Sequence, residues 1–512
     1  MKNRVLLIVF LLTWGISLPG LIAQKVQFDS LETFIDTMMM DFDVPGLSIG
    51  IVQNDSIIYC KGFGLRDVGK DLSVDENTIF GIGSISKSFT ALTLGILVDE
   101  GKINWDDKVR DYIPYFELYE PYVSENFTVR DLLTHRSGLK FVSGGMLLYH
   151  TDFSRADIIK RLKYLKPVSG FREIAAYQNV MYLVVAEIVQ EVSGMSWDDF
   201  LQIKVFDKTG MENSTSVSTQ RDKITNIAQP HIWDEHFKKQ AIEHESCNNI
   251  ASVGFIYSSA KEMSNYMRLL LNNGVYENDT IVSSKVVNEI FKPQIHYQSL
   301  PAPIHNEFTS YGFGWWLTPK NGHKIIDHSG GIDGMSANLI MIKDLNFGVI
   351  VMTNTDELAA YLLTFKVLEQ VLNDGSYDIY VKVKSWRDDR LERKKRSALE
   401  LEATRINGTK PSLSLKSYTG IYTDQMYGDI TISKLDDEVL EISFSHSPVF
   451  RGILKHWHYD TFQVDWYDTR IPDGFITFNF NSKREILGIT IDQKNLLDVD
   501  FSELEILKKK TE

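Results

Sequence analysis

The sequence predicts an α/β sandwich with an inserted helical domain, followed by a small all-β barrel. Two observations support this prediction. Strand-like patterns occur near the start of the chain and again over residues 312–354, and a largely helical block separates them. From about Leu413 the pattern changes to short strands with Gly, Asp and Asn turns. One sheet is therefore expected to be assembled from distant pieces of the chain, with a second domain after it.

The elements of the first domain can be placed from their periodicity. An amphipathic helix is expected over residues 30–43, with Leu31 and Ile35 among the residues on its apolar face. Two strands follow, and Asn54-Asp55 between them is a hairpin signal. These two strands are expected at 46–53 and 56–64. The elements expected after them are a helical block at 84–273, strands at 312–318, 323–330, 336–343 and 347–354, and a helix at 358–372.

The chain can be divided into four expected segments. A secretory signal occupies residues 1–23, and the sandwich with its helical insertion occupies residues 24–376. A charged helical linker follows at 377–412, and the barrel occupies 413–512. Seven short strands are predicted in this last segment, at 418–424, 428–435, 438–445, 451–458, 461–467, 475–480 and 486–492.

Composition restricts the class of function. With 512 residues, 43% of them hydrophobic, the chain can bury a large core. Its formal net charge is −14, and acidic and basic residues are interspersed. This pattern argues against a surface for nucleic acid or anionic membrane. The expected partner is a small-molecule or peptide substrate, and a homo-oligomer stays open.

The N-terminal segment is typical of a secretory signal. Lys2 and Arg4 precede the apolar run VLLIVFLL. The alternative is an uncleaved membrane anchor, but several residues such as Trp14 and Pro19 interrupt the second half of the segment. Cleavage before Gln24 is favoured, so we expect a periplasmic or secreted protein with no stable membrane span.

Cysteines and metal-ligand patterns contribute little. Cys60 and Cys247 are the only cysteines, and whether they pair is open. No His/Cys/Asp/Glu cluster has recognisable metal-ligand spacing. The sequence therefore predicts no metal and no cofactor.

Ser84 and Lys87 are three residues apart at the start of a long, nearly uncharged helix, in FGIGSISKSFTALTLGILVDEG. Residues at i and i+3 share a helix face, so the lysine amine can lie beside the serine hydroxyl. A serine nucleophile needs a neighbouring base, and burial lowers the pKa of a lysine toward that role. The helix start adds backbone N–H groups suited to an oxyanion. The pair is a candidate acyl-transfer site, and the alternative is an N-capped core helix.

Two other Ser-x-x-Lys matches have a different context. One begins at Ser137, in a turn with Gly138 directly after the serine, where helical geometry is not expected. The other begins at Ser258, which looks like a plain helix N-cap followed by Glu262 in the first turn. Neither is followed by a long buried helix, so Ser84 is the preferred candidate.

Tyr177-Gln178-Asn179 precedes the apolar helix NVMYLVVAEIV and offers two further catalytic parts. A nearby lysine ammonium favours the phenolate of a tyrosine, so Tyr177 can act as base toward the serine and acid toward the leaving group. Asn179 offers both a donor and an acceptor to a substrate amide. The alternative is that Tyr177 is a structural tyrosine.

His328-Ser329-Gly330-Gly331 ends a predicted strand. The glycines let a substrate approach the backbone closely, and the Gly331 N–H can point at an oxyanion. We expect His328 and Ser329 to face the leaving side of the substrate or its carboxylate. The alternative is a glycine turn that closes a strand.

These three motifs, in this order, resemble the serine β-lactamase and penicillin-binding-protein superfamily. The match is closest to the branch with class C β-lactamases, D-aminopeptidases and family VIII esterases, and it covers about residues 44–372. The resemblance implies a β-lactamase-like sandwich with an antiparallel sheet and an acyl-enzyme on Ser84. It also implies Lys87 and Tyr177 as base and proton relay, an oxyanion held by the N–H groups of Ser84 and Gly331, and hydrolysis without cofactor or metal. The tail from about Leu413 resembles a lipocalin-like barrel.

The sequence departs from the superfamily pattern at two places. His328 occupies the position of a β-lactamase lysine, so the fixed positive charge that holds a β-lactam carboxylate is absent or pH-dependent. The segment PVSGFREIAAYQN before Tyr177 is also unusual. The triplet Lys208-Thr209-Gly210 matches a familiar β-lactamase motif, but it follows a helix and looks like a C-cap.

The leading hypothesis is an exported serine hydrolase that cleaves an amide or ester. Candidate substrates are a D-amino-acid peptide, a peptidoglycan fragment or a small ester. The alternatives are a β-lactamase, or a penicillin-binding or sensing protein that acylates without efficient turnover.

Overall fold

The computed structural model describes residues 26–233, 238–298, 305–375, 379–436, 438–493, 496, 498–504 and 507–509. Its first domain is built on an antiparallel sheet with the strand order β10-β11-β12-β13-β14-β15-β1-β2-β3. β1 (Gly46–Gln53) pairs with β2 (Ser56–Asp67) on one side and with β15 (Phe347–Thr353) on the other. The N-terminal hairpin thus completes a sheet whose other main strands lie far along the chain, which confirms the prediction of one sheet from distant pieces. The remaining strands of the sheet are β3 (Lys70–Ser73), β10 (Ile295–His296), β11 (Ser310–Tyr311), β12 (Trp316–Lys320), β13 (His323–Ile332) and β14 (Met335–Ile342).

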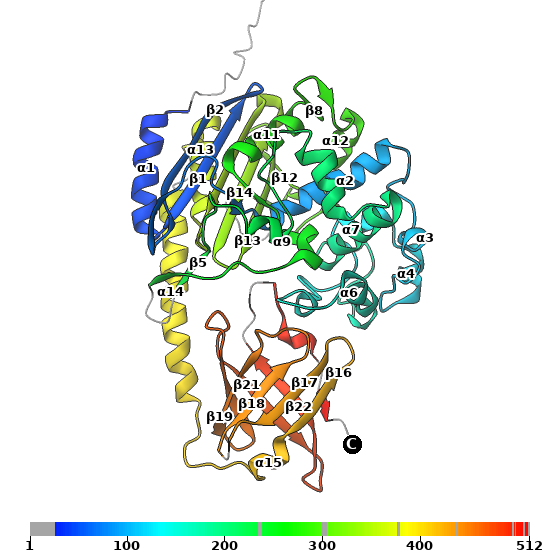
Figure 1. Cartoon of the computed structure of the whole chain (residues 1–512), viewed down its shortest axis with the longest axis vertical. Helices are drawn as coiled ribbons and strands as arrows, with labels where there is room; N and C mark the ends of the chain where they lie inside the picture. Colours follow the sequence, from blue (N-terminus) through cyan, green and yellow to red (C-terminus); the bar gives the residue numbers. More distant parts are fainter. Residues whose placement is uncertain are drawn as a thin grey trace, which may run out of the picture.

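The sheet separates two hydrophobic cores because side chains alternate between its faces. Ile49 and Ile51 of β1 belong to the core on one face, together with residues from the three helices α1 (Phe28–Asp41), α13 (Ala359–Leu372) and α14 (Ile379–Ala403). Val52, after a register shift in β1, belongs to the other core. Figure 1 shows α1 and α13 beside the sheet, with the helical insertion on its other side. The expected amphipathic helix is confirmed, since Leu31, Ile35 and Met38 of α1 are buried.

The helical insertion lies between β3 and β10 in the chain and holds the nearly apolar helices α2 and α7 against each other. Every residue of α2 from Ser86 to Leu97 is buried, because this helix passes through the centre of the domain. The principal helices of the insertion are α2 (Ser86–Asp99), α4 (Pro121–Asn126), α5 (Val129–Leu133), α6 (Arg155–Arg161), α7 (Val180–Ser193), α8 (Trp197–Leu201), α10 (Ala251–Gly254), α11 (Ala260–Leu271) and α12 (Ser284–Ile290).

The C-terminal part is a closed barrel in which β16 pairs with both β17 and β23. Each of the seven predicted strands is present, while β23, which closes the barrel, was not predicted. The lipocalin-like resemblance stays a prediction. The barrel strands are β16 (Gly420–Asp424), β17 (Gly428–Lys434), β18 (Leu440–Phe444), β19 (Arg451–His458), β20 (Thr461–Trp466), β21 (Gly474–Phe480), β22 (Ile486–Gln493) and β23 (Leu507–Lys509).

The barrel docks on the helical insertion and lies below the first domain in Figure 1. His446 accepts through its carbonyl from the Asp152 N–H at 3.0 Å, and its ring lies 2.7 Å from the Asp152 carboxylate. The same ring stacks on Phe153 with centroids 3.8 Å apart. Arg161 donates to the carbonyl of Met426 at 2.8 Å. These contacts hold one end of the barrel against the helical insertion.

The sequence analysis also made predictions about an N-terminal signal, a membrane span and the two cysteines. The proposed signal at residues 1–23 lies outside the described residues. Among the helices of the described ranges, none is both long and apolar enough to cross a membrane. Cys60 and Cys247 are both free thiols, so they do not pair with each other.

Candidate active site

Ser84 lies in a short 3-10 turn, Gly83–Ile85, directly before α2. Gly83 has φ +53°, and a Cβ there would lie 2.3 Å from the backbone nitrogen of Gly331. Only glycine tolerates both the positive φ and this approach. The glycine therefore lets β13 pass directly over the turn that presents the serine.

Lys87 is fully buried and reaches back from the first turn of α2. Its Nζ donates to Ser84 Oγ at 2.9 Å and to the carbonyl of Val253 at 2.7 Å. Burial lowers the pKa of Lys87 to about 7, and the charge of Asp498 offsets part of this effect. A substantial fraction of the lysine is then neutral near pH 7, as a base for the serine requires.

Tyr177 comes just before α7, and its ring lies over the lysine, with Lys87 Nζ 4.9 Å from the ring centroid. Burial raises the pKa of Tyr177 well above its usual value, and the neighbouring Ser84 hydroxyl offsets only part of this shift. The expected phenolate is therefore not favoured, because desolvation outweighs the nearby positive charge. Tyr177 is a protonated phenol, suited to donating rather than removing a proton.

Asn179, immediately before α7, is buried at 4% exposure. Its Nδ2 donates to Asp498 Oδ2 at 2.9 Å. Its Oδ1 has no hydrogen-bond partner within the described part of the chain. One of the two N–H donors of this amide is thus already used within the protein, while the acceptor is left.

β13 carries His328, Ser329, Gly330 and Gly331 past the serine. His328 is buried at 2% exposure; its Nε2 lies 3.2 Å from the Tyr311 hydroxyl, and its Nδ1 lies 2.6 Å from the Ser329 carbonyl. Burial lowers the pKa of His328 to about 3, with the charge of Lys87 acting in the same direction. The ring is therefore neutral near pH 7 and presents no positive charge to a substrate.

The alternation of β13 decides which of its residues faces the nucleophile. A Cβ at Gly330 would lie 2.0 Å from the carbonyl of Ile82 and 2.8 Å from the Ser84 nitrogen. Ser329 and Gly331 point the other way and are exposed. The backbone of β13 thus lies against the Ser84 turn, which brings the two expected oxyanion donors, Ser84 and Gly331, to one pocket.

A pocket of about 80 Å³ opens beside Ser84. Of the predicted site residues, Ser84, Asn179 and Gly331 line it. The others are not among its lining residues: Lys87, Tyr177, His328, Ser329 and Gly330. Its complete lining is Ser84, Gly145, Leu148, Tyr149, Asn179, Glu245, Ile250, Val253, Gly254, Phe255, Gly331, Ile332, Asp333, Asp498 and Val499.

Asp498 and Val499 come from the barrel and were missed by the sequence analysis. Asp498 has φ +59°, and its carbonyl lies so close to Gly145 that a Cβ there would be 1.7 Å away. Nearby, both carboxylate oxygens of Glu503 accept from the Gly144 N–H, at 2.9 and 3.0 Å. No local pattern distinguishes Asp498 from other acidic residues of the barrel, so only the docking of the two domains identifies it.

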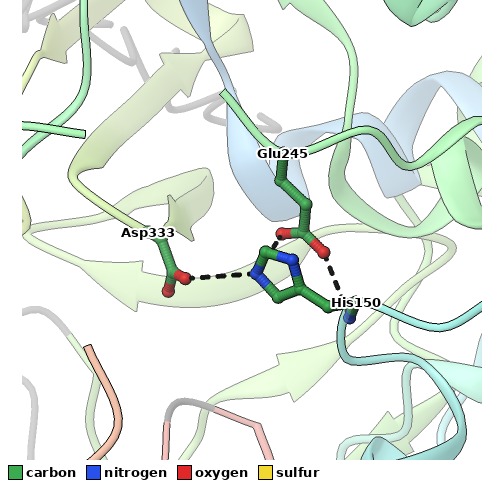
Figure 2. Close-up of side chains that lie close together, drawn as sticks. All are labelled: His150, Glu245 and Asp333. Atoms are coloured by element: carbon green, nitrogen blue, oxygen red, sulfur yellow. Dashed lines mark hydrogen bonds and ion pairs between the residues drawn. The ribbon is translucent and has the colours of Figure 1, made fainter. Parts of the chain in front are cut away.

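His150, Glu245 and Asp333 form a cluster beside the pocket (Figure 2). His150 Nε2 is 3.5 Å from Glu245 Oε2 and 3.7 Å from Asp333 Oδ2. Of the residues described, these three have one ligand atom each within 4.8 Å of the others, as a metal site would need. However, Arg470 of the barrel lies 3.3 Å from the same Asp333 oxygen, and Tyr149 donates to it at 2.9 Å. A guanidinium at this distance opposes a bound cation, so the cluster fits an ion-pair network better than a metal centre.

The sheet, the helical insertion and the Ser84–Lys87 pair define a protein of the β-lactamase and penicillin-binding-protein type. The family model described as Beta-lactamase matches residues 31–368, and the chain belongs to that family. A second family model, Domain of unknown function (DUF3471), matches residues 404–508, which include the barrel strands β16 to β22.

Comparison with known proteins gives distant relatives. Penicillin-binding protein 4* of Bacillus subtilis is 28% identical over 68% of this chain and 77% of its own. Unguisins hydrolase ungD of Aspergillus violaceofuscus is 24% identical over 76% of this chain and 73% of its own. The octameric penicillin-binding protein homologue from Pyrococcus abyssi has the same fold, with a TM-score of 0.62, 22% identity, and coverage of 92% of this chain and 99% of its own.

Proposed function

We propose that the protein is a serine hydrolase that cleaves an amide or ester bond through a covalent acyl-enzyme on Ser84. The observation that carries this proposal is the 2.9 Å contact between Lys87 Nζ and Ser84 Oγ in a buried setting. Burial holds the pKa of Lys87 at about 7, so the neutral amine is available as a base near neutral pH. A buried structural lysine usually has an ionic partner. Among the described residues, however, the hydrogen bonds of Lys87 go to Ser84 and to the Val253 carbonyl, and it makes no ion pair.

The reaction begins when neutral Lys87 takes the proton of Ser84 as Oγ bonds to the substrate carbonyl carbon. The backbone N–H groups of Ser84 and Gly331 are the candidates to hold the resulting oxyanion. When the carbonyl re-forms, the bond to the leaving group breaks, and the protonated phenol of Tyr177 can donate a proton to that group. The Lys87 ammonium returns its proton to Tyr177. Water then repeats the sequence on the acyl-enzyme, releasing the acid and restoring the serine hydroxyl.

The candidate substrates are a D-amino-acid peptide, a peptidoglycan fragment or a small ester. The neutral state of His328 supports this choice over a β-lactam, whose carboxylate would meet no fixed positive charge there.

The test is the intact mass of the protein after incubation with a neutral fluorophosphonate, and separately with penicillin. Phosphonylation that is absent in a folded Ser84→Ala variant supports the serine hydrolase. A penicillin adduct that persists would favour the penicillin-binding alternative, and rapid penicillin turnover would favour a β-lactamase. Absence of any phosphonate adduct on the folded wild-type protein would refute the proposal.

Export and assembly are further parts of the proposal. The segment at residues 1–23 supports secretion with Gln24 as the mature N-terminus, which N-terminal sequencing of the cell-exported protein tests. The octameric state named for the Pyrococcus abyssi homologue makes a homo-oligomer worth measuring by light scattering.

A further inference from the structure

The barrel supplies a charged residue to the catalytic pocket. Asp498 lines the same pocket as Ser84, although it lies in the C-terminal part of the chain. Its Oδ2 accepts from Asn179 Nδ2, and its charge acts on Lys87. The backbone of Asp498 is held against Gly145, where a Cβ would lie 1.7 Å from its carbonyl. The carboxylate is therefore positioned by both domains.

Asp498 differs from the two other acidic residues of the pocket. Asp333 has Arg470 at 3.3 Å and a hydrogen bond from Tyr149. Glu245 lies 3.5 Å from His150, and burial raises its pKa, which favours its neutral form. For Asp498, the described residues provide the Asn179 amide but no ion pair. Its charge is thus the one on the pocket wall that lacks a cationic partner at contact distance.

Next to Asp498 is a second acceptor without a partner. Asn179 lines the pocket, and its Oδ1 is buried and accepts no hydrogen bond from the described residues. A buried acceptor left unpaired costs free energy until a ligand donates to it. One carboxylate and one amide oxygen side by side suit a group that has several donors and a positive charge. An ammonium has three donors and no acceptor, so it fits both.

Apart from the backbone N–H groups of Ser84 and Gly331, the described lining of the pocket offers no cation to an anion. None of these lining residues is a lysine or arginine, and neutral His328 is buried and is not among them. A substrate carboxylate placed here would meet Asp498 directly and be repelled.

We propose that Asp498 is a specificity-determining residue that selects substrates with a primary ammonium near the scissile carbonyl, since Asp498 and Ser84 line the same pocket. This inference rests on the proposed serine hydrolase function. In it, the ammonium donates to the Asp498 carboxylate and to Asn179 Oδ1, which orients the carbonyl toward Ser84. The barrel is then part of the active site, since without it the hydrolase domain lacks the anionic half of this subsite.

The test compares alanine p-nitroanilide with lactic acid p-nitroanilide, in both configurations, at pH 7. These probes differ by an ammonium against a hydroxyl of similar size. For the wild-type protein we expect kcat/KM for the preferred alanyl probe to exceed that of its lactyl counterpart by at least tenfold. Asp498→Asn keeps the shape and removes the charge, so it should lower the alanyl value about ten- to hundredfold and leave the lactyl value within threefold.

Two controls separate this inference from the proposed function. Asp436→Asn makes the same change of charge at an exposed position in the turn between β17 and β18. This turn is at the opposite end of these strands from His446, which contacts the helical insertion. The variant should therefore leave kcat/KM for both probes unchanged. Neutral fluorophosphonate should still label Ser84 in Asp498→Asn at pH 7. Loss of the Asp498 charge lowers the pKa of Lys87 further, so the rate should rise by no more than about twofold. If Ser84 is labelled but the alanyl probe is not preferred, the inference fails and the serine hydrolase stands. If kcat/KM for both probes rises in Asp498→Asn beyond the threefold tolerance, Asp498 only obstructs the pocket, and the inference is overturned. If Ser84 is not labelled at all, both proposals fail.

Discussion

Lys87 Nζ lies 2.9 Å from Ser84 Oγ, and among the described residues its one other hydrogen bond goes to the carbonyl of Val253. Because Lys87 is fully buried, its pKa falls to about 7. The proposed nucleophile and its proposed base are therefore adjacent, and the charge state of the lysine changes near neutral pH. The first two predictions follow from this relationship.

The rate of Ser84 phosphonylation should depend on pH through Lys87. Below pH 7 the lysine is increasingly protonated, so the rate with a neutral fluorophosphonate should fall about tenfold per pH unit, and above pH 8 it should reach a plateau. Lys87→Met should lose about a hundredfold or more of the plateau rate. Mass spectrometry of samples quenched at set times measures the labelling rates of both proteins. A wild-type rate that is flat between pH 5.5 and 8 would show that Lys87 is not the base.

Lys87 should also affect the pH dependence of stability. Between the folded pKa of about 7 and the unfolded value of about 10.5, the unfolded lysine binds a proton that the folded one does not. Stability conferred at this position therefore rises with pH in that window, by about 1.4 kcal/mol per unit, and is lost as pH falls toward 7.

Denaturant unfolding of wild-type protein and Lys87→Met at pH 7, 8 and 9 measures this slope. Methionine does not titrate, so the free energy of unfolding of the wild type should rise relative to that of Lys87→Met as pH rises. The comparison of slopes is unaffected by the unpaired Val253 carbonyl in the variant, since that cost is the same at each pH. A difference independent of pH would contradict the lowered pKa of Lys87.

Gly330→Ala should separate β13 from the serine. The new Cβ would lie 2.0 Å from the Ile82 carbonyl and 2.8 Å from the Ser84 nitrogen, and both of these are backbone atoms that cannot rotate away. We expect at least a hundredfold slower phosphonylation and a destabilisation of about 1–3 kcal/mol. Gly375→Ala is the matched control, because no atom of the described residues lies within 4 Å of a Cβ there. Full activity in Gly330→Ala would mean that the strand need not lie against the nucleophile turn.

Penicillin should gain no advantage at acidic pH. His328 is neutral because burial lowers its pKa to about 3, so acidification from pH 7 to 5 creates no positive charge at that position. The ratio of the acylation rate by penicillin to that by neutral fluorophosphonate should therefore stay constant over this range, even as both rates fall with the protonation of Lys87. A ratio that rises as pH passes through 6 would instead indicate a protonated His328.

Local sequence predicted much of the architecture and part of the site. Periodicity located β1 at its observed bounds, 46–53, and the spacing of Ser84 and Lys87 was sufficient to place their side chains together. These features depend on contacts within a turn or on the alternation of a strand, so they can be read from neighbouring residues. Ser84 itself lies in the 3-10 turn that precedes α2, one step before the helix in which it was expected.

The charge states were beyond local prediction. A lysine beside Tyr177 was expected to favour the phenolate, but the structure buries the phenol completely enough for desolvation to dominate. His328 is likewise neutral because Tyr311 and the strand backbone enclose it. Burial of this kind is a sum over elements distant in sequence, which a motif does not contain.

The sequence by itself determined the serine, the lysine, the sheet assembled from both ends of the first domain, and the strands of the barrel, because each depends on short-range pattern. Tertiary structure decided what surrounds the serine. Docking of the barrel carries Asp498 to Asn179 across 319 residues of chain, and it places Arg470 beside Asp333. A carboxylate in a loop acquires its role only from the groups it meets after folding, since electrostatic interactions act through space and not along the chain.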